Sequence, residues 1–119
     1  MLNIIINCLL LVLPLPGNIY SYSISIPFLG NQEIKTYIRN ENSASIKLEG
    51  IINKNGIIRY YEKNNIPIIY FSYNLRKIKN KYNIDYTVPY YDYILDQIIF
   101  DINIKKINFS KKIIMKKLN

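Results

Sequence analysis

Isoleucine and tyrosine alternate with polar residues along most of the chain, and this two-residue period predicts β-strands. Ser21–Phe28 shows the pattern clearly: serines occupy one face, and the other carries Tyr22, Ile24, Ile26 and Phe28. The same alternation predicts seven more strands. They are Glu33–Arg39, Ser45–Ile52, Ile57–Glu62, Ile68–Tyr73, Asn83–Val88, Gln97–Lys105 and Ile113–Leu118.

The most specific turn pattern lies between the predicted strands Ser45–Ile52 and Ile57–Glu62. Lys54-Asn55-Gly56 predicts a three-residue hairpin loop, because Gly56 can take a positive φ at no steric cost. In that register Gly50 faces Tyr60. One side of the hairpin would then carry Ile46, Leu48, Ile52, Ile58 and Tyr60.

The period changes once, over residues 74–82. Leu75, Ile78 and Tyr82 fall at i, i+3 and i+7, which predicts a short helix. Asn74 can cap its first turn and Asn83 can end it. Four cations lie away from the apolar stripe: Arg76, Lys77, Lys79 and Lys81.

The C-terminal third is less regular. Pro89 breaks the strand before it, and Tyr90–Tyr93 is predicted as a turn or loop. The apolar phase slips at Lys105-Lys106, which predicts a β-bulge, and Ser110–Lys112 is predicted as the last turn.

Strands spaced this closely and joined by short turns are typical of an antiparallel meander. We therefore predict a mainly β fold of about seven or eight strands, as a sheet, sandwich or open barrel, with one short helix near residues 75–82.

Residues 1–20 form an apolar leader, and residues 21–119 are predicted as a single β-rich domain with a Lys-rich segment at 105–119. The leader fits a signal peptide or anchor, cleaved after Gly17 or Ser21, although it lacks the usual basic start. A buried first strand is one alternative, and an upstream truncation or a wrong start is the other. Secretion or membrane association follows if residues 1–17 or 1–21 act as a leader, and an intracellular location otherwise.

Composition weakens what the charge implies. The chain has 26 Ile, 16 Asn, 13 Lys and 12 Tyr, residues that A/T-rich codons encode, so an A/T-rich gene accounts for part of the net charge of +8. The charge is nevertheless uneven, since residues 101–119 carry six Lys and one Asp, a net of +5.

Several chemistries are missing from the sequence. The chain has no His, and its one thiol, Cys8, lies in the apolar leader, which excludes Ser-His-Asp and Cys-His nucleophile systems. Phosphate-cradling glycine motifs are absent too. Asp92, Asp96 and Asp101 are close in sequence, and we interpret them as solvated charges. We expect a protein that is not an enzyme, with no catalytic residues, no metal ligands and no cofactor.

The remaining candidates are binding residues. Lysine pairs interleaved with apolar residues suit an anionic membrane surface or a nucleic-acid backbone, and exposed tyrosines suit any contact surface. The candidates are Lys105, Lys106, Lys111, Lys112, Lys116, Lys117, Tyr90, Tyr91 and Tyr93.

Three hypotheses follow for the function. The first is a β-sheet interaction or structural protein with a protein partner. The second is a polyanion binder that holds nucleic acid or anionic lipid. The third is a barrel that encloses an apolar ligand.

Overall fold

The computed structural model describes residues 14–64 and 66–118, so most of the predicted leader lies outside the described residues. Strands make up 63% of the described residues, which confirms the mainly β prediction. The strands are β1 (Ile19–Ile26), β2 (Gly30–Asn40), β3 (Ser43–Gly50), β4 (Lys54–Lys63), β5 (Ile66–Phe71), β6 (Ile84–Tyr86), β7 (Tyr90–Asp92), β8 (Gln97–Ile104) and β9 (Phe109–Lys117). The helices are α2 (Tyr73–Tyr82) and the 3-10 turn η1 (Lys105–Ile107).

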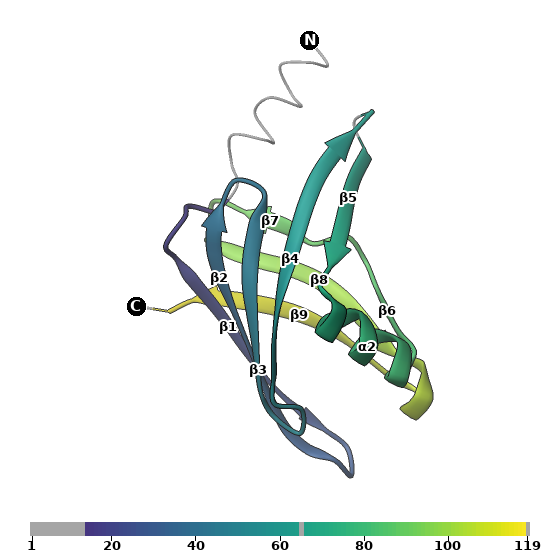
Figure 1. Cartoon of the computed structure of the whole chain (residues 1–119). Coiled ribbons are helices and arrows are strands. Elements are labelled where there is room, and N and C mark those ends of the chain that lie inside the picture. The colour runs from purple at the N-terminus through teal and green to yellow at the C-terminus, as the bar shows by residue number, and fades with distance from the viewer. Residues whose placement is uncertain (1–13, 65, 119) are drawn as a thin grey trace.

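These strands form one antiparallel sheet curled into a half-barrel (Figure 1). Five strands follow the chain as a meander, and β9 then pairs with β1, giving the order β5-β4-β3-β2-β1-β9-β8-β6, with β7 also on β8. The two ends of the sheet come together: Phe71 of β5 meets Tyr86 of β6 edge-on, with ring centroids 5.2 Å apart. Helix α2 connects these two edge strands.

The core fills the concave face, as the alternation predicts. Tyr20, Ile113 and Met115 are fully buried there, and Phe100 and Ile113 face each other across β8 and β9. The prediction for the first strand fails at one end. Tyr22, Ile24 and Ile26 belong to the core, but Phe28 lies beyond the strand and is fully exposed.

Strand β1 begins inside the range predicted as leader. Ile19 and Tyr20 belong to the strand, and the Tyr20 side chain has no exposed surface. Ile19 and Tyr20 therefore belong to the sheet, although they fall inside the predicted leader. Neither helix in the described part of the chain has the length and apolarity needed to cross a bilayer.

The predicted register of the central hairpin is wrong. The backbone N–H of Tyr60 bonds to the carbonyl of Asn42, eight residues from the predicted partner Gly50 (50 − 42 = 8). Gly50, at φ 131°, begins the turn instead, and the Asn53 side chain bonds its N–H and its carbonyl at 3.1 and 2.9 Å. Because the displacement is even, the faces stay as predicted, with Tyr60 and Ile58 toward the core side.

Gly56 has a different role from the predicted one. It lies within β4 opposite Ile46, and a Cβ at this position would clash with the Leu75 side chain of α2. Leu75 is the buried residue of the helix. The bare backbone of Gly56 thus lets α2 pack directly on the sheet.

Three predictions near the C-terminus are also wrong. Tyr90–Asp92 pairs with β8 as strand β7. The chain reverses at Lys105–Asn108, where Asn108 has φ 50°, so the phase slip marks a hairpin rather than a bulge. Ser110, Lys111 and Lys112 then lie inside β9 instead of forming a turn.

Candidate anion-binding face

Helix α2 presents cations because its other side is fixed to the sheet. Ser72 precedes the first turn, but its hydroxyl accepts a hydrogen bond from the Ile57 N–H at 3.0 Å instead of capping the helix. The predicted cap, Asn74, lies inside the helix and donates to the Asn55 carbonyl at 3.1 Å. With Leu75 directed at β4, Arg76, Lys77 and Lys81 are exposed, and Lys79 is half-buried.

The helix ends as predicted and leads directly to η1. Asn83 closes α2 in the left-handed conformation at φ 52°. Its carbonyl accepts a hydrogen bond from the Lys105 N–H at 3.1 Å. This bond places the first residue of η1, which follows β8, next to the C-terminal end of α2.

Lysines from both elements gather around two tyrosines. The ammonium groups of Lys81 and Lys106 lie 5.4 and 6.0 Å from the centre of the Tyr82 ring. The Lys79 ammonium lies 6.0 Å from the Tyr86 ring. Such cation–π contacts hold cations in place without neutralising them.

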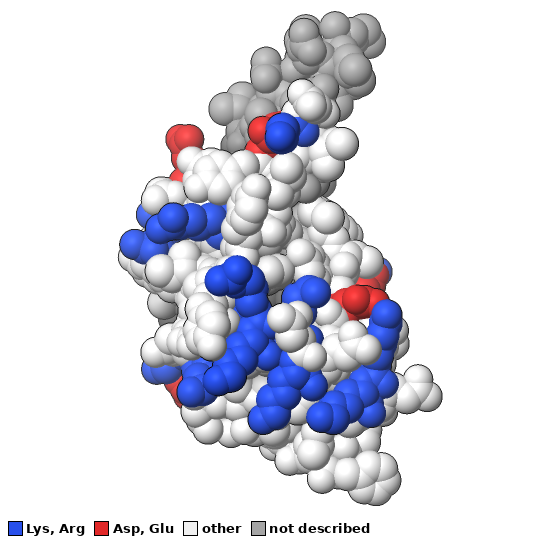
Figure 2. Space-filling view, turned by 45° about the vertical axis from the view of Figure 1, so that its right-hand side comes forward, with Lys and Arg blue, Asp and Glu red and all other residues white. Residues whose placement is uncertain are grey.

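We call this surface the basic face, and it consists of Arg76, Lys77, Lys79, Lys81, Lys105 and Lys106. One carboxylate lies within it: Asp85 pairs with Lys105 at 2.7 Å, and this contact holds the pKa of the Asp85 carboxyl below its usual value. Six cations against one acid leave a local net of +5 (6 − 1). Figure 2 shows the Lys and Arg side chains gathered in the lower half of a view that brings this side forward.

The lysines also suit the helix on which they lie. Lys79 and Lys81 occupy the last turn, where unpaired carbonyls create a partial negative charge. That interaction stabilises a helix by about 0.3–1 kcal/mol per charge. This interaction explains the position of Lys79 and Lys81. It does not explain the other four cations of the basic face, which are Arg76, Lys77, Lys105 and Lys106.

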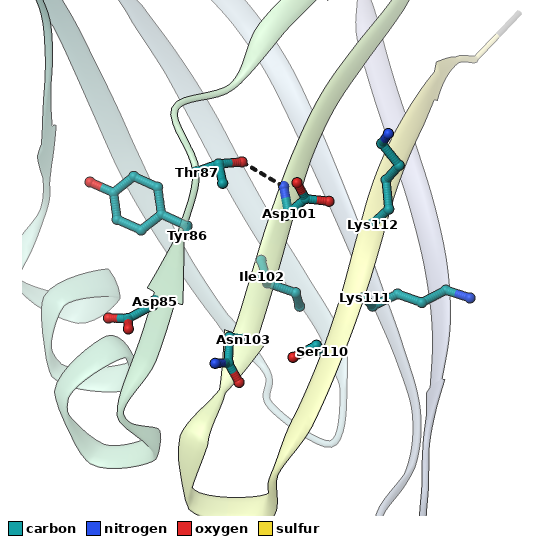
Figure 3. A pocket seen from close by; sticks show the side chains of 9 residues that line it. All are labelled: Asp85, Tyr86, Thr87, Asp101, Ile102, Asn103, Ser110, Lys111 and Lys112. Carbon is teal, nitrogen blue, oxygen red and sulfur yellow. Dashed lines mark hydrogen bonds between the residues drawn. The ribbon is translucent and has the colours of Figure 1, made fainter.

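The predicted lysine pairs do not form one site. Lys105 and Lys106 join the basic face, whereas the other pairs lie on β9, whose side chains alternate between two faces. Lys111 and Lys112 point away from α2 (Figure 3). Lys117 lies 3.8 Å from Asp96.

The predicted tyrosines also separate. Tyr90 and Tyr93 are exposed, with 57% and 61% of their surface accessible. Tyr91 belongs instead to a partly buried network, in which its hydroxyl donates to Asp96 Oδ1 at 2.6 Å and the Tyr20 hydroxyl donates to the same oxygen at 2.5 Å.

This network shifts three pKa values. Hydrogen bonds from the two hydroxyls lower the pKa of the Asp96 carboxyl, and nearby Lys117 acts in the same direction. Burial, and then the bond to Asp96, raises the pKa of both Tyr20 and Tyr91. Because each polar group has a partner, we interpret the network as an anchor that holds the turn at residues 93–96 on the core.

The three aspartates singled out in the sequence have separate environments. Asp92 accepts hydrogen bonds from the N–H groups of Ile94 and Leu95, both at 3.1 Å, so it shapes a turn. Asp96 bonds the two tyrosines, and Asp101 is exposed on β8. Among the described residues, no three His, Cys, Asp or Glu side chains could together hold a metal ion.

An open depression of about 400 Å³ lies over β6, β8 and β9 (Figure 3). Its charged lining is mixed, with Asp85 and Asp101 beside Lys111 and Lys112. On one wall Thr87 Oγ1 accepts a hydrogen bond from the Asp101 N–H at 2.8 Å. Carboxylates and ammonium groups in equal number give this depression no preference for an anion or a cation.

The helix part of the basic face has a signal in the sequence, and the predicted site residues do not include it. Residues 73–82 contain four cations and no acid, and the segment ends in Tyr82. The link to η1 had no such sign, because it depends on the hairpin at Lys105–Asn108. Comparisons with protein-family models, curated proteins and solved structures found no match to this chain.

Proposed function

We propose that this chain is a binding protein for an anionic surface and that the basic face is its contact site. The observation that carries the proposal is the meeting of α2 and η1, which brings lysines 25 residues apart (106 − 81) around one tyrosine ring. Cations held together in this way attract a polyanion much more strongly than the same cations spread over the surface.

Two other hypotheses from the sequence receive less support. An apolar ligand would lie on the concave face, which Tyr20, Ile113 and Met115 already fill. A protein partner remains a second candidate, because β5 has a strand neighbour on one side only within the described chain, and Ile66 and Tyr70 are exposed on it. Added strands bind through backbone hydrogen bonds, so that mode would survive high salt.

Retention on a heparin column tests the proposal. The variant Lys77→Gln/Lys81→Gln/Lys106→Gln removes three charges from the basic face, and we expect it to elute at clearly lower salt than the wild type. The matched variant Lys111→Gln/Lys112→Gln/Lys116→Gln removes three charges from β9 and should elute near the wild type. Equal losses in the two variants, or a wild type that flows through at low salt, would contradict the proposal.

A further inference from the structure

The connection between β1 and β2 ends in an exposed apolar tip, Pro27-Phe28-Leu29. Phe28 is 107% exposed, more than in an extended reference peptide, and Leu29 is 48% exposed. Phe28 also has φ 65°, a left-handed conformation that is rare for a bulky side chain. The exposed Phe28 side chain adds nothing to the core, and its left-handed backbone is unfavourable. Strained and exposed apolar residues concentrate at contact sites.

The tip is braced from behind. The Leu29 N–H bonds to the Ile26 carbonyl at 3.1 Å, which closes the turn. The β3–β4 turn supports it, because the side chain of buried Gln32 accepts from the Ile52 N–H at 2.7 Å and donates to the Ile52 carbonyl at 3.0 Å. Two hairpins joined in this way hold the phenyl ring out from the body of the protein.

Hydrogen bonds connect the end of the sheet that carries the tip to the basic face. The Asn55–Asn74 bond links the start of β4, just after the β3–β4 turn, to the start of α2 and so to the basic face. The nearby acids are already paired, Glu33 with Lys35 at 3.1 Å and Glu49 with Lys47 at 2.8 Å. The β1–β2 end is lowest in Figure 1, and the lower end of the molecule projects beyond the cations in Figure 2.

From this arrangement we propose that the basic face docks on an anionic lipid bilayer and that Phe28 and Leu29 insert at the boundary between headgroups and acyl chains. The inference rests on the proposed function and names its partner. Lysines beside an apolar projection match a membrane, where phosphates lie outside the hydrocarbon. A nucleic acid would use an aromatic ring for stacking but offers no apolar layer to Leu29.

The absence of Trp from the sequence allows a specific probe. Phe28→Trp places one indole at the tip, and we expect its emission to shift to the blue, with protection from a soluble quencher, on vesicles of phosphatidylcholine containing about one-third phosphatidylserine. Single-stranded DNA should produce no such protection. Tyr70→Trp, at an exposed position of β5, is the matched control and should stay accessible to the quencher in both cases.

A second variant measures the contribution of the tip to binding. Phe28→Ser/Leu29→Ser should weaken partition into these vesicles by roughly tenfold or more, while heparin retention stays unchanged. Both chains share residues 1–13, so the difference comes from the tip. If the vesicles bind but the indole at position 28 stays accessible, insertion is wrong and anion binding stands. If neither vesicles nor heparin retain the protein at low salt, the proposed function itself fails.

Discussion

Asp96 joins two tyrosines, one 76 and one 5 residues away in the sequence. From the sequence we predicted a solvated aspartate here. Nothing in the local pattern indicates that the turn after β7 folds back against β1. Tyr20 likewise fell in the predicted leader, so its burial could not be expected. Contacts between residues this distant depend on the order of strands in the sheet, which alternation does not encode.

Replacing Asp96 by Ala should destabilise the fold by about 1–3 kcal/mol, because the fully buried Tyr20 hydroxyl loses its acceptor. Urea unfolding would measure the loss, and Asp101→Ala, at an exposed position on β8, is the control with little expected effect.

The loss of stability in Asp96→Ala should depend on pH. Because the pKa of Asp96 is lower in the folded state, its contribution is complete above the ordinary value of 3.8 and is lost as the pH falls through the folded-state pKa. The gap between wild type and Asp96→Ala should therefore narrow below about pH 4. A gap that stays constant down to pH 2, or no gap at neutral pH, would count against the anchor.

Elements were easier to predict than their partners. Alternation located most of the strands, since burial on one face imposes a period of two whatever the neighbours are. It missed the hairpin at Lys105–Asn108 because a turn and a bulge shift the phase in the same way. Gly56 was assigned to a turn for a similar reason: a glycine after Asn indicates a turn in isolation, while its real constraint is the close approach of α2.

Gly56→Ala should destabilise the protein by about 1–3 kcal/mol, because the new methyl group overlaps the Leu75 side chain. The test is a double-mutant cycle. In the background of Leu75→Ala the two shortest contacts are gone and only the Ser72 hydroxyl, 2.9 Å from the new methyl group, remains, so adding Gly56→Ala should cost less than it does in the wild type. Additive losses in urea unfolding would mean that Gly56 matters for its backbone freedom and not for the helix contact.

At the level of the domain, β1 is the strand on which the sheet depends. It lies between β2 and β9 and so joins the N-terminal meander to the C-terminal hairpin. The meander could be predicted from short turns, but this pairing of the first and last strands could not. The same closure brings η1 to the end of α2, which explains why the basic face was visible in the sequence only as two separate groups of lysines.

In the folded protein some lysines pair with carboxylates and others do not. Four lysines of the described chain pair with carboxylates, at Lys35, Lys47, Lys105 and Lys117. The cations of α2 have no carboxylate within ion-pair distance in the described structure. An A/T-rich gene explains many lysines, but it does not explain why cations without a carboxylate partner gather on one helix of the described structure.

Amide chemical-shift mapping with a heparin oligosaccharide locates the contact on the folded protein. We expect the largest shifts at Arg76–Tyr82 and Lys105–Asn108, fading as salt is raised, with small shifts along β9. Shifts concentrated on Lys111–Lys117, or spread evenly over the cations, would contradict a binding site formed by α2 and η1.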